Sequence, residues 1–271
     1  MGKFDGVLFF SDYDDTLYNH RLEVSQENRD AIHYFIKEGG RFSIATGRAH
    51  RTFTPQIELE RLEFNAPVVL SNGAAIYDYT QDRYLVETFL PPDTPERMAE
   101  VCARFPELAF EAYYGEDIYL YNSNIVSETH LKRVGVPYFQ CAIEDMPRPW
   151  IKVIMEQDEP YLKDIQAFVL DRWGDEFEAI FSNRYLLELT AKNSNKGAMV
   201  ARAAELLGID LGHIYCIGDN QNDIPMLALS AIPFAPANCA PAVKEWGARV
   251  LNHCDDHAVA QAIEILDGIY H

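Results

Sequence analysis

Short apolar runs and helix-spaced apolar positions alternate along the first part of the chain. Buried strands are predicted at residues 7–10, 42–45 and 67–70. Between the first two, apolar side chains recur at helical spacing over residues 25–37, with Ser25 placed to cap the helix start and Gly39 to end it. Strands that are apolar throughout and separated by a helix are typical of a parallel sheet covered on both faces.

The last eighty residues repeat this alternation. Helices are predicted at residues 196–207, 224–229 and 258–266, and strands at 214–217 and 232–234. The two ends of the chain therefore predict one α/β core of the Rossmann-like type, with a parallel sheet.

The middle of the chain has a different pattern. Helices are predicted at residues 94–104 and 161–173, and strands at 108–114, 118–121, 150–155 and 177–181. Such a mixture indicates an α+β module inserted into the α/β core. We expect residues 1–88 and 189–271 to form the core, and residues 89–188 to form an inserted cap domain.

Composition narrows the possible partners and location. No apolar run reaches the ~18 residues needed to span a bilayer, and the N-terminus does not resemble a signal peptide, so we expect a cytoplasmic protein without membrane contact. The formal net charge of −19 repels nucleic acid, which excludes that class of partner. The same charge opposes an anionic ligand, so a phosphate site in this chain would need a bound cation. The oligomeric state stays open.

The five cysteines are scattered and contain no C-x-x-C pair. Their spacing argues against a disulfide framework and against a structural zinc site. We expect buried or partly buried free thiols.

The sequence Asp12-Tyr13-Asp14-Asp15-Thr16-Leu17 follows the first predicted strand directly. Ligands of open α/β sheets bind outside the carboxyl ends of the strands. There, Asp12 could act as a nucleophile and metal ligand, and Asp14 as a general acid and base. Taken alone, this pair is also consistent with an acidic turn that caps the next element.

Three further patterns lie at strand or helix ends. Gly218-Asp219-Asn220-Gln221-Asn222-Asp223 offers oxygen ligands suited to Mg²⁺, although an Asx-rich turn would read the same way. Thr46-Gly47-Arg48 could cradle an anion with a hydroxyl and backbone N–H groups, or could simply cap a helix. Lys196 begins a predicted helix, where its charge opposes the helix dipole; alone, it would be read as a solvated surface side chain.

Taken in their order along the chain, from Asp12 through Thr46 and Lys196 to Gly218, the four patterns resemble the haloacid dehalogenase superfamily of phosphotransferases. Ser71-Asn72-Gly73-Ala74 followed by Ile76-Tyr77-Asp78 is similar to a hairpin of its Cof-type subfamily. The resemblance covers the core halves of the chain, and it places the cap after the second motif, as a lid over the site. It departs from the family pattern at Asp15, where glycine is usual.

The resemblance implies a role for each matching residue. Asp12 would attack phosphorus and form an aspartyl-phosphate, and Asp14 would protonate the leaving oxygen and then activate water. Phosphate oxygens would be held by Thr46, Gly47, Lys196 and Asn222. Mg²⁺ would be bound by Asp12, Asp14 through its backbone carbonyl, and Asp219, with Asp223 in support.

The resulting prediction is a Mg²⁺-dependent phosphatase that acts on a small phosphorylated molecule, either a sugar phosphate or a cofactor phosphate. A phosphomutase on the same core, a non-enzymatic receiver module that accepts phosphate and a silent binding protein are alternatives. The core motifs do not identify the substrate. The tyrosines at 113, 114, 119 and 121 could stack on a ligand ring, but packing within a sheet accounts for them more simply.

Overall fold

Strand β1 (Leu8–Ser11) is the fourth of five strands in a parallel sheet whose order is β14-β13-β12-β1-β2. The computed structural model describes residues 2–271. The other strands of this sheet are β2 (Arg41–Ile44), β12 (Ile214–Ile217), β13 (Pro233–Ala235) and β14 (Arg249–Val250). All four side chains of β1 are buried, because helices cover both faces of the sheet.

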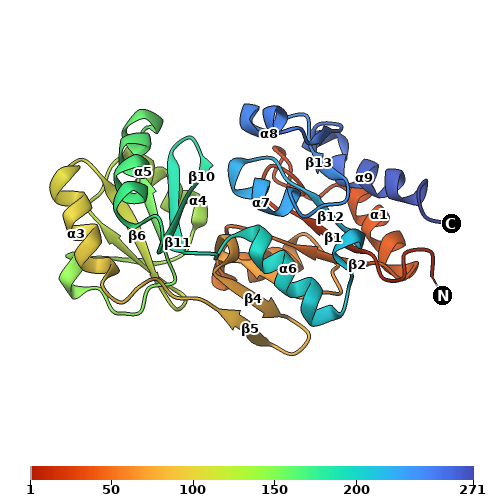
Figure 1. Cartoon of the computed structure of the whole chain (residues 1–271), viewed down its shortest axis with the longest axis horizontal. Coiled ribbons are helices and arrows are strands. Elements are labelled where there is room, and N and C mark those ends of the chain that lie inside the picture. The colour runs from red at the N-terminus through yellow and green to blue at the C-terminus, as the bar shows by residue number, and fades with distance from the viewer. Residues whose placement is uncertain (1) are drawn as a thin grey trace.

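Successive side chains of β1 point to opposite faces of the sheet and into two separate apolar clusters. Phe9 packs with one cluster, together with residues of α1 (Gln26–Lys37), α2 (His50–Leu59) and α9 (Ala258–Asp267). Leu8 and Phe10 pack with the other, together with residues of the helices α6 (Lys196–Leu207), α7 (Ile224–Leu227) and α8 (Pro241–Trp246). The period-2 alternation of a strand thus fixes β1 between two helical layers (Figure 1).

A three-stranded antiparallel sheet extends the core beyond β2. It consists of β3 (Val68–Leu70), β4 (Ala75–Asp78) and β5 (Arg83–Glu87), and a parallel bridge between Ala45 and Val69 joins β3 to the end of β2. The turn between β3 and β4 requires glycine at position 73. Its φ is +98°, and a Cβ atom there would lie 2.2 Å from the backbone carbon of Asn195.

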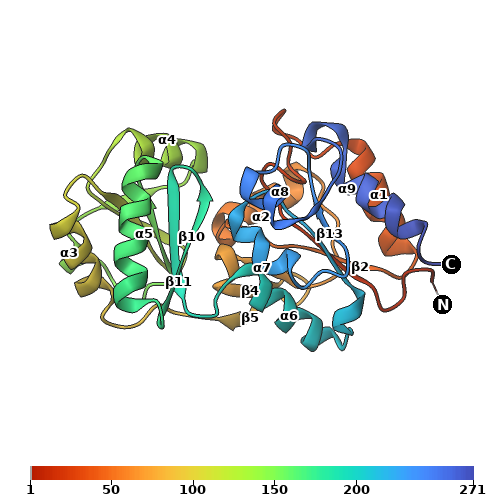
Figure 2. The same cartoon turned by 45° about the horizontal axis from the view of Figure 1, so that its top comes forward.

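Residues between β5 and α6 form a second lobe, seen beside the core in Figures 1 and 2. Its six-stranded sheet has the order β10-β11-β9-β6-β7-β8. The strands are β6 (Ala109–Tyr114), β7 (Asp117–Tyr121), β8 (Tyr138–Gln140), β9 (Lys152–Glu156), β10 (Phe177–Asn183) and β11 (Leu186–Ala191). Helices α3 (Thr94–Arg104) and α5 (Glu159–Trp173) pack on one face of this sheet. Helix α4 (Ile125–Val134) packs on the other face, in a cluster that includes Ala49 and Ala74 of the core.

The structure confirms the α/β fold class and the α+β character of the middle of the chain. Helix α4 was not predicted, although Asn124 caps its start and Gly135 ends it in a left-handed conformation. We propose that the inserted domain spans residues 89–188; its strand β11 continues three residues further, to Ala191. No helix in the described part of the chain is long and apolar enough to cross a membrane.

Candidate active site

Asp12 lies at the carboxyl end of β1, where three parallel strands end together. Ser11 pairs with Ile217 of β12 and with Ile44 of β2, so the residues after each strand meet at one edge of the sheet. The backbone N–H of Asp12 donates to the carbonyl of Ile217 at 2.9 Å, which extends the ladder by one residue and fixes the direction of the Asp12 side chain. The predicted meeting of the D-x-D segment with Asp219 follows from this register.

Lys196 reaches Asp12 from the start of α6. Its Nζ donates to Oδ1 of Asp12 at 2.5 Å and to Oδ1 of Asp223 at 2.6 Å, and the side chain is only 1% exposed. The buried ammonium therefore has two carboxylate partners. Within the described residues, the other oxygen of Asp12, Oδ2, has no hydrogen bond and is left to react or to bind a ligand.

The loop after β12 brings two more carboxylates to this point. Asp219 accepts a hydrogen bond from the hydroxyl of Thr16 at 3.1 Å, and Oδ2 of Asp223 accepts the backbone N–H groups of Asp219 and Asn220 at 2.9 Å each. Gly218 makes this tight turn possible, because a Cβ atom there would lie 2.4 Å from the carboxyl carbon of Asp223. The segment from Gly218 to Asp223 is thus held in a tight turn by hydrogen bonds from its own backbone to the Asp223 carboxylate.

The donor set fits a divalent metal ion. Oxygens of Asp12, Asp219 and Asp223 lie within 4.8 Å of one another, and three carboxylates face the single ammonium of Lys196. Burial raises the pKa of Asp12 to about 7, with Lys196 lowering it and Asp223 raising it further. Burial likewise raises the pKa of Asp219 well above its ordinary value. A hard cation held by carboxylate oxygens would supply the missing positive charge.

The residues predicted to hold phosphate divide into two groups. Gly47 and Asn222 line the cavity above Asp12, and Asn222 donates to the side chain of Asn72 at 2.9 Å. Thr46 is 1% exposed and accepts the backbone N–H of Arg48 at 3.1 Å. Thr46, Lys196 and Asp223 are buried and are not among the residues that line the cavity, and Lys196 contacts the Asp12 carboxylate.

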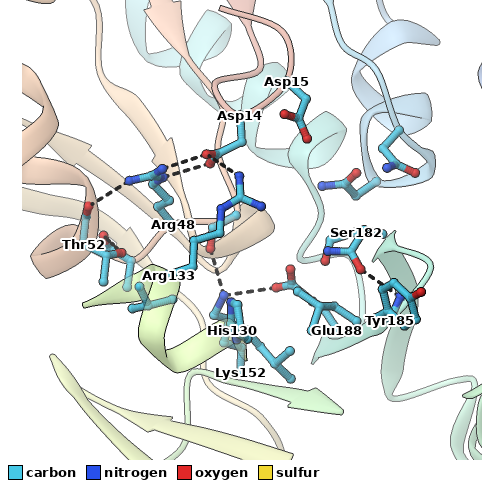
Figure 3. Close-up of a pocket in the computed structure, with 18 of the residues that line it drawn as sticks. Asp14, Asp15, Arg48, Thr52, His130, Arg133, Lys152, Ser182, Tyr185 and Glu188 are labelled. Carbon is cyan, nitrogen blue, oxygen red and sulfur yellow. Dashed lines mark hydrogen bonds and ion pairs between the residues drawn. The ribbon is translucent and has the colours of Figure 1, made fainter. Parts of the chain in front are cut away.

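Asp14 is held by an arginine of the neighbouring strand end. Arg48 Nε and Nη2 donate to Oδ2 and Oδ1 of Asp14 at 2.8 and 2.7 Å, a bidentate pair visible in Figure 3. The guanidinium also lies 5.0 Å from the ring centre of Tyr13. From the second lobe, Arg133 of α4 approaches the same carboxylate at 3.7 Å. Asp14 therefore points into the space between the lobes, with its orientation set by arginine.

A cavity of about 520 Å³ lies between the two lobes. The core contributes Asp12, Asp14, Asp15, Arg48 and Asp219 to its wall. The second lobe contributes residues of α4, of strands β6, β9, β10 and β11, and of the turn between the last two, among them Tyr113, His130, Arg133, Lys152, Tyr185 and Glu188. Its size suits a small molecule, and its polar groups come from both lobes.

Lys152 links the lobes at the back of this cavity. Its Nζ donates to the carbonyl of Gly47 at 2.8 Å and to Glu188 at 3.1 Å, and it lies 4.6 Å from the ring centre of Tyr113. The side chain of Lys152 is 2% exposed. A buried ammonium with this set of partners ties the second lobe to the Thr46-Gly47-Arg48 segment, and so positions the lobe over Asp12.

Glu111, His130 and Glu156 form a second buried charged cluster in the wall of the second lobe. Nδ1 of His130 lies 3.0 Å from Glu111 and 2.9 Å from Glu156, and neither carboxylate is exposed. Tyr113 donates to Glu111 at 2.8 Å. Although burial opposes the charge, these carboxylates raise the pKa of His130 to about 10; burial raises the pKa of Glu156 to about 7. The cluster therefore keeps a cationic imidazole at the cavity wall.

These shifts predict a pH-dependent stability. Folding raises the pKa of Glu156 from 4.5 to about 7. The group therefore stabilises the fold fully below pH 4.5, and this contribution is lost as the pH rises through 7. The stabilisation from His130 is complete below pH 6.5, its pKa in the unfolded chain, and is lost as the pH rises through 10. Urea unfolding should therefore show a lower free energy of unfolding at pH 8.5 than at pH 5.5. In Glu156→Gln this difference should shrink by on the order of 1–2 kcal/mol.

Glu128→Gln, an exposed change on the same helix as His130, is the matched control and should keep the wild-type difference between the two pH values. If Glu156→Gln also kept the wild-type difference, the carboxylate would not be the titrating group.

Four residues of the second lobe that shape the cavity were not predicted from the sequence: His130, Arg133, Lys152 and Glu188. The signal that could have found the last two is a charged residue in an apolar strand: Lys152 lies on β9, which is buried at all five positions, and Glu188 lies on β11, which is buried at its first five. Of the four tyrosines considered, Tyr113 lines the cavity, whereas Tyr119 stacks on Phe139 and Tyr121 on Phe110. Sheet packing accounts for the last two.

Comparison with known proteins gives a consistent picture. The model of a family described as haloacid dehalogenase-like hydrolase matches residues 9–263. The 5-amino-6-(5-phospho-D-ribitylamino)uracil phosphatase YwtE of Bacillus subtilis is 26% identical over 285 residues, which cover 96% of this chain and 98% of that protein. YcsE of the same organism, which carries the same description, is 28% identical over 262 residues, covering 96% and 95%.

Solved structures agree with the fold. A haloacid dehalogenase-like hydrolase from Bacteroides thetaiotaomicron superposes with a TM-score of 0.81 at 25% identity, covering 96% of this chain and 99% of that one. The subclass IIB sugar phosphatase BT4131 superposes with a TM-score of 0.85 at 19% identity, covering 96% and 99%. The second likeness concerns the fold alone.

Proposed function

Because the chain belongs to the haloacid dehalogenase-like hydrolases, we propose that it is a Mg²⁺-dependent phosphatase in which Asp12 is the nucleophile. The observation that carries this proposal is the state of the Asp12 carboxylate. Lys196 holds one of its oxygens at 2.5 Å, the other faces the cavity, and Asp14 projects from two residues further along the same segment. This arrangement suits in-line attack on a phosphorus atom placed between the lobes.

In the first half-reaction, Oδ2 of Asp12 attacks phosphorus, and the bond between phosphorus and the leaving oxygen breaks. Asp14 donates a proton to that oxygen, so the product leaves as a neutral alcohol. Both oxygens of Asp14 accept from Arg48, at 2.8 and 2.7 Å, so one of these hydrogen bonds must open for Asp14 to carry the proton that it donates. The phosphoryl group is now on Asp12.

In the second half-reaction, Asp14 accepts a proton from water, and the water oxygen attacks the phosphorus of the aspartyl-phosphate. Inorganic phosphate leaves, and the Asp12 carboxylate is restored. Lys196 also contacts Asp223 at 2.6 Å, which gives the ammonium a second anchor besides Asp12. Gly47 and Asn222 line the cavity, which supports their proposed contact with phosphate oxygens.

Asp12, Asp219 and the backbone carbonyl of Asp14 would hold the Mg²⁺ ion, with Asp223 in support. Bound there, the ion would offset the negative charge that a phosphate adds to this acidic site. Such an ion would also reduce the repulsion between an anionic substrate and a chain with a net charge of −19.

We propose a phosphorylated small molecule as the substrate, in the class of sugar or cofactor phosphates. A leaving group in the cavity would meet hydroxyl and amide groups of Ser182, Asn183 and Tyr185, and apolar side chains of Ile125 and Leu186. This lining suits a polyol chain attached to a flat ring. The substrate named in the description of two relatives, a ribitylamino-uracil phosphate, has such a group.

Removal of metal is expected to abolish activity. With an aryl phosphate as substrate, EDTA should reduce turnover to background, and added Mg²⁺ should restore it, because three carboxylates and one ammonium leave the site too negative for phosphate. Full turnover in metal-free buffer would contradict the metal dependence. A Mg²⁺-supplemented screen of sugar phosphates, pyridoxal phosphate, nucleotides and the ribitylamino-uracil phosphate would then identify the substrate class.

A further inference from the structure

A cluster of mixed metal-binding donors lies on the core, beside the loop that carries Asp12 and Asp14. It consists of His20, His253, Cys254 and Asp255, each of which offers a ligand atom within 4.8 Å of the others. None of these four residues takes part in the proposed phosphatase chemistry. Two imidazoles, a thiol and a carboxylate form a set typical of Zn²⁺ and unlike the all-oxygen set around Asp12.

Four separations within the cluster, between 3.4 and 3.9 Å, are close to those expected between the ligands of a tetrahedral ion. Zn²⁺ bonds of ~2.3 Å to sulfur and ~2.05 Å to nitrogen place two ligand atoms about 3.6 Å apart at the tetrahedral angle. Sγ of Cys254 lies 3.6 Å from Nδ1 of His253 and 3.9 Å from Oδ1 of Asp255. Nδ1 of His253 lies 3.4 Å from Oδ2 of Asp255, and Nδ1 of His20 lies 3.8 Å from that same oxygen.

Asp15 completes this arrangement from the outside. Nε2 of His20 lies 3.5 Å from Oδ1 of Asp15, on the opposite side of the ring from the nitrogen near Asp255. Metal-bound histidines commonly place their second ring nitrogen against a carboxylate, which fixes the tautomer and the ring orientation. Asp15 stands where the family pattern has glycine and adopts a left-handed φ of +60°. Its side chain thus gains a role that glycine could not fill.

The cluster is accessible and well braced. The side chain of His20 is 48% exposed and that of His253 is 33% exposed, which leaves a route for an ion, whereas Cys254 is fully buried. Asn238 accepts the backbone N–H of Cys254 at 3.0 Å and donates to the carbonyl of Asp15 at 2.7 Å. Nδ1 of His253 accepts the backbone N–H of Asp255 at 3.1 Å, so an ion would replace one long hydrogen bond.

We propose that His20, His253, Cys254 and Asp255 bind one Zn²⁺ ion, with Asp15 orienting His20. Binding converts the Cys254 thiol to a thiolate and releases its proton to solvent. The ion ties the loop after β1 to the segment before α9, and so steadies the backbone on which Asp14 stands. The sequence argument against a zinc site rested on the absence of a Cys-x-x-Cys pair. The donors proposed here come instead from position 20 and from positions 253–255, which are far apart in the sequence.

Cobalt substitution tests this proposal without relying on turnover. The full chain, stripped with a chelator and held in excess Mg²⁺ to fill the oxygen site, is titrated with Co²⁺. We expect one equivalent to produce thiolate-to-cobalt charge-transfer absorption and the intense visible bands of a tetrahedral site, and Zn²⁺ to abolish both. Cobalt bound by carboxylates alone gives no thiolate band.

Variants assign the ligands. Cys254→Ser should lose the charge-transfer band, and Cys102→Ser, which removes another buried thiol, should keep it. His20→Gln and Asp15→Asn should weaken Zn²⁺ binding by about 10–100-fold, measured by competition with a chromophoric chelator. Zn²⁺ should also raise the Tm of the wild type by on the order of 5 °C. If Cys254→Ser failed to fold, the partly exposed His20→Gln would carry the assignment.

A wild-type protein without the thiolate band, a band that persists in Cys254→Ser, or unchanged Zn²⁺ affinity in His20→Gln would overturn the proposal. Each of these outcomes leaves the role of Asp12 untouched, because the spectrum does not depend on phosphate transfer.

Discussion

Asp12→Asn is expected to abolish turnover while leaving the protein folded. The amide has the size of the carboxylate but cannot attack phosphorus, so the aspartyl-phosphate does not form. Loss of a nucleophile reduces kcat by on the order of 10⁴-fold or more. The structure adds a reason for the fold to survive, since Lys196 has a second carboxylate partner, Asp223 at 2.6 Å, which the change does not remove.

Burial already disfavours the charged form of Asp12, as its raised pKa of about 7 shows. The thermal melt of Asp12→Asn should therefore lie within a few degrees of the wild type. Asp30→Asn, an exposed change on α1, is the matched control and should keep full kcat. Near-normal turnover in a folded Asp12→Asn protein would exclude the aspartyl-phosphate route.

The core of the site could be predicted because its residues follow apolar strands directly. An apolar run that ends in Asp12, and another that ends in Gly218-Asp219, indicate where two parallel strands stop. The register then brings both segments to one edge of the sheet. The prediction was correct about which segments meet, because that depends on local pattern and topology.

What could not be predicted is where each polar side chain points. Lys196 is expected to hold phosphate, and the sequence does not show that its ammonium also contacts both Asp12 and Asp223. The pair between Arg48 and Asp14 joins residues 34 positions apart, and no local periodicity specifies such a contact. Tertiary packing decides these geometries.

The second lobe was predicted less completely, for a related reason. Strands β6 and β9 have buried charged residues, Glu111, Lys152 and Glu156, which a simple apolar alternation would place on an exposed face. They are tolerated because each finds a partner within the lobe or on the core. Helix α4 carries His130 and Arg133 on the side that lines the cavity, so its apolar stripe is narrow and its periodicity weak.

Asp14→Asn is expected to affect two substrates to different extents. An aryl phosphate releases a stable anion and needs little protonation, whereas a sugar phosphate releases a basic alkoxide. Proton donation contributes typically ~10²–10⁴-fold for poor leaving groups. The variant should therefore lose far more of its phosphorylation rate with a sugar phosphate than with an aryl phosphate.

The same variant should trap the phosphorylated enzyme. Asparagine cannot accept a proton from water, so hydrolysis of the aspartyl-phosphate slows after a fast first step with the aryl substrate. Rapid quenching with labelled aryl phosphate should show a burst of protein-bound phosphate followed by slow release.

The structure raises a competing explanation for any loss of activity, because Asp14→Asn also weakens the bidentate pair with Arg48. A misplaced Arg48 would slow both substrates alike and give no burst, whereas loss of the acid and base separates the substrates and produces one. Equal losses without a burst would make Asp14 a partner of Arg48 and not the proton donor.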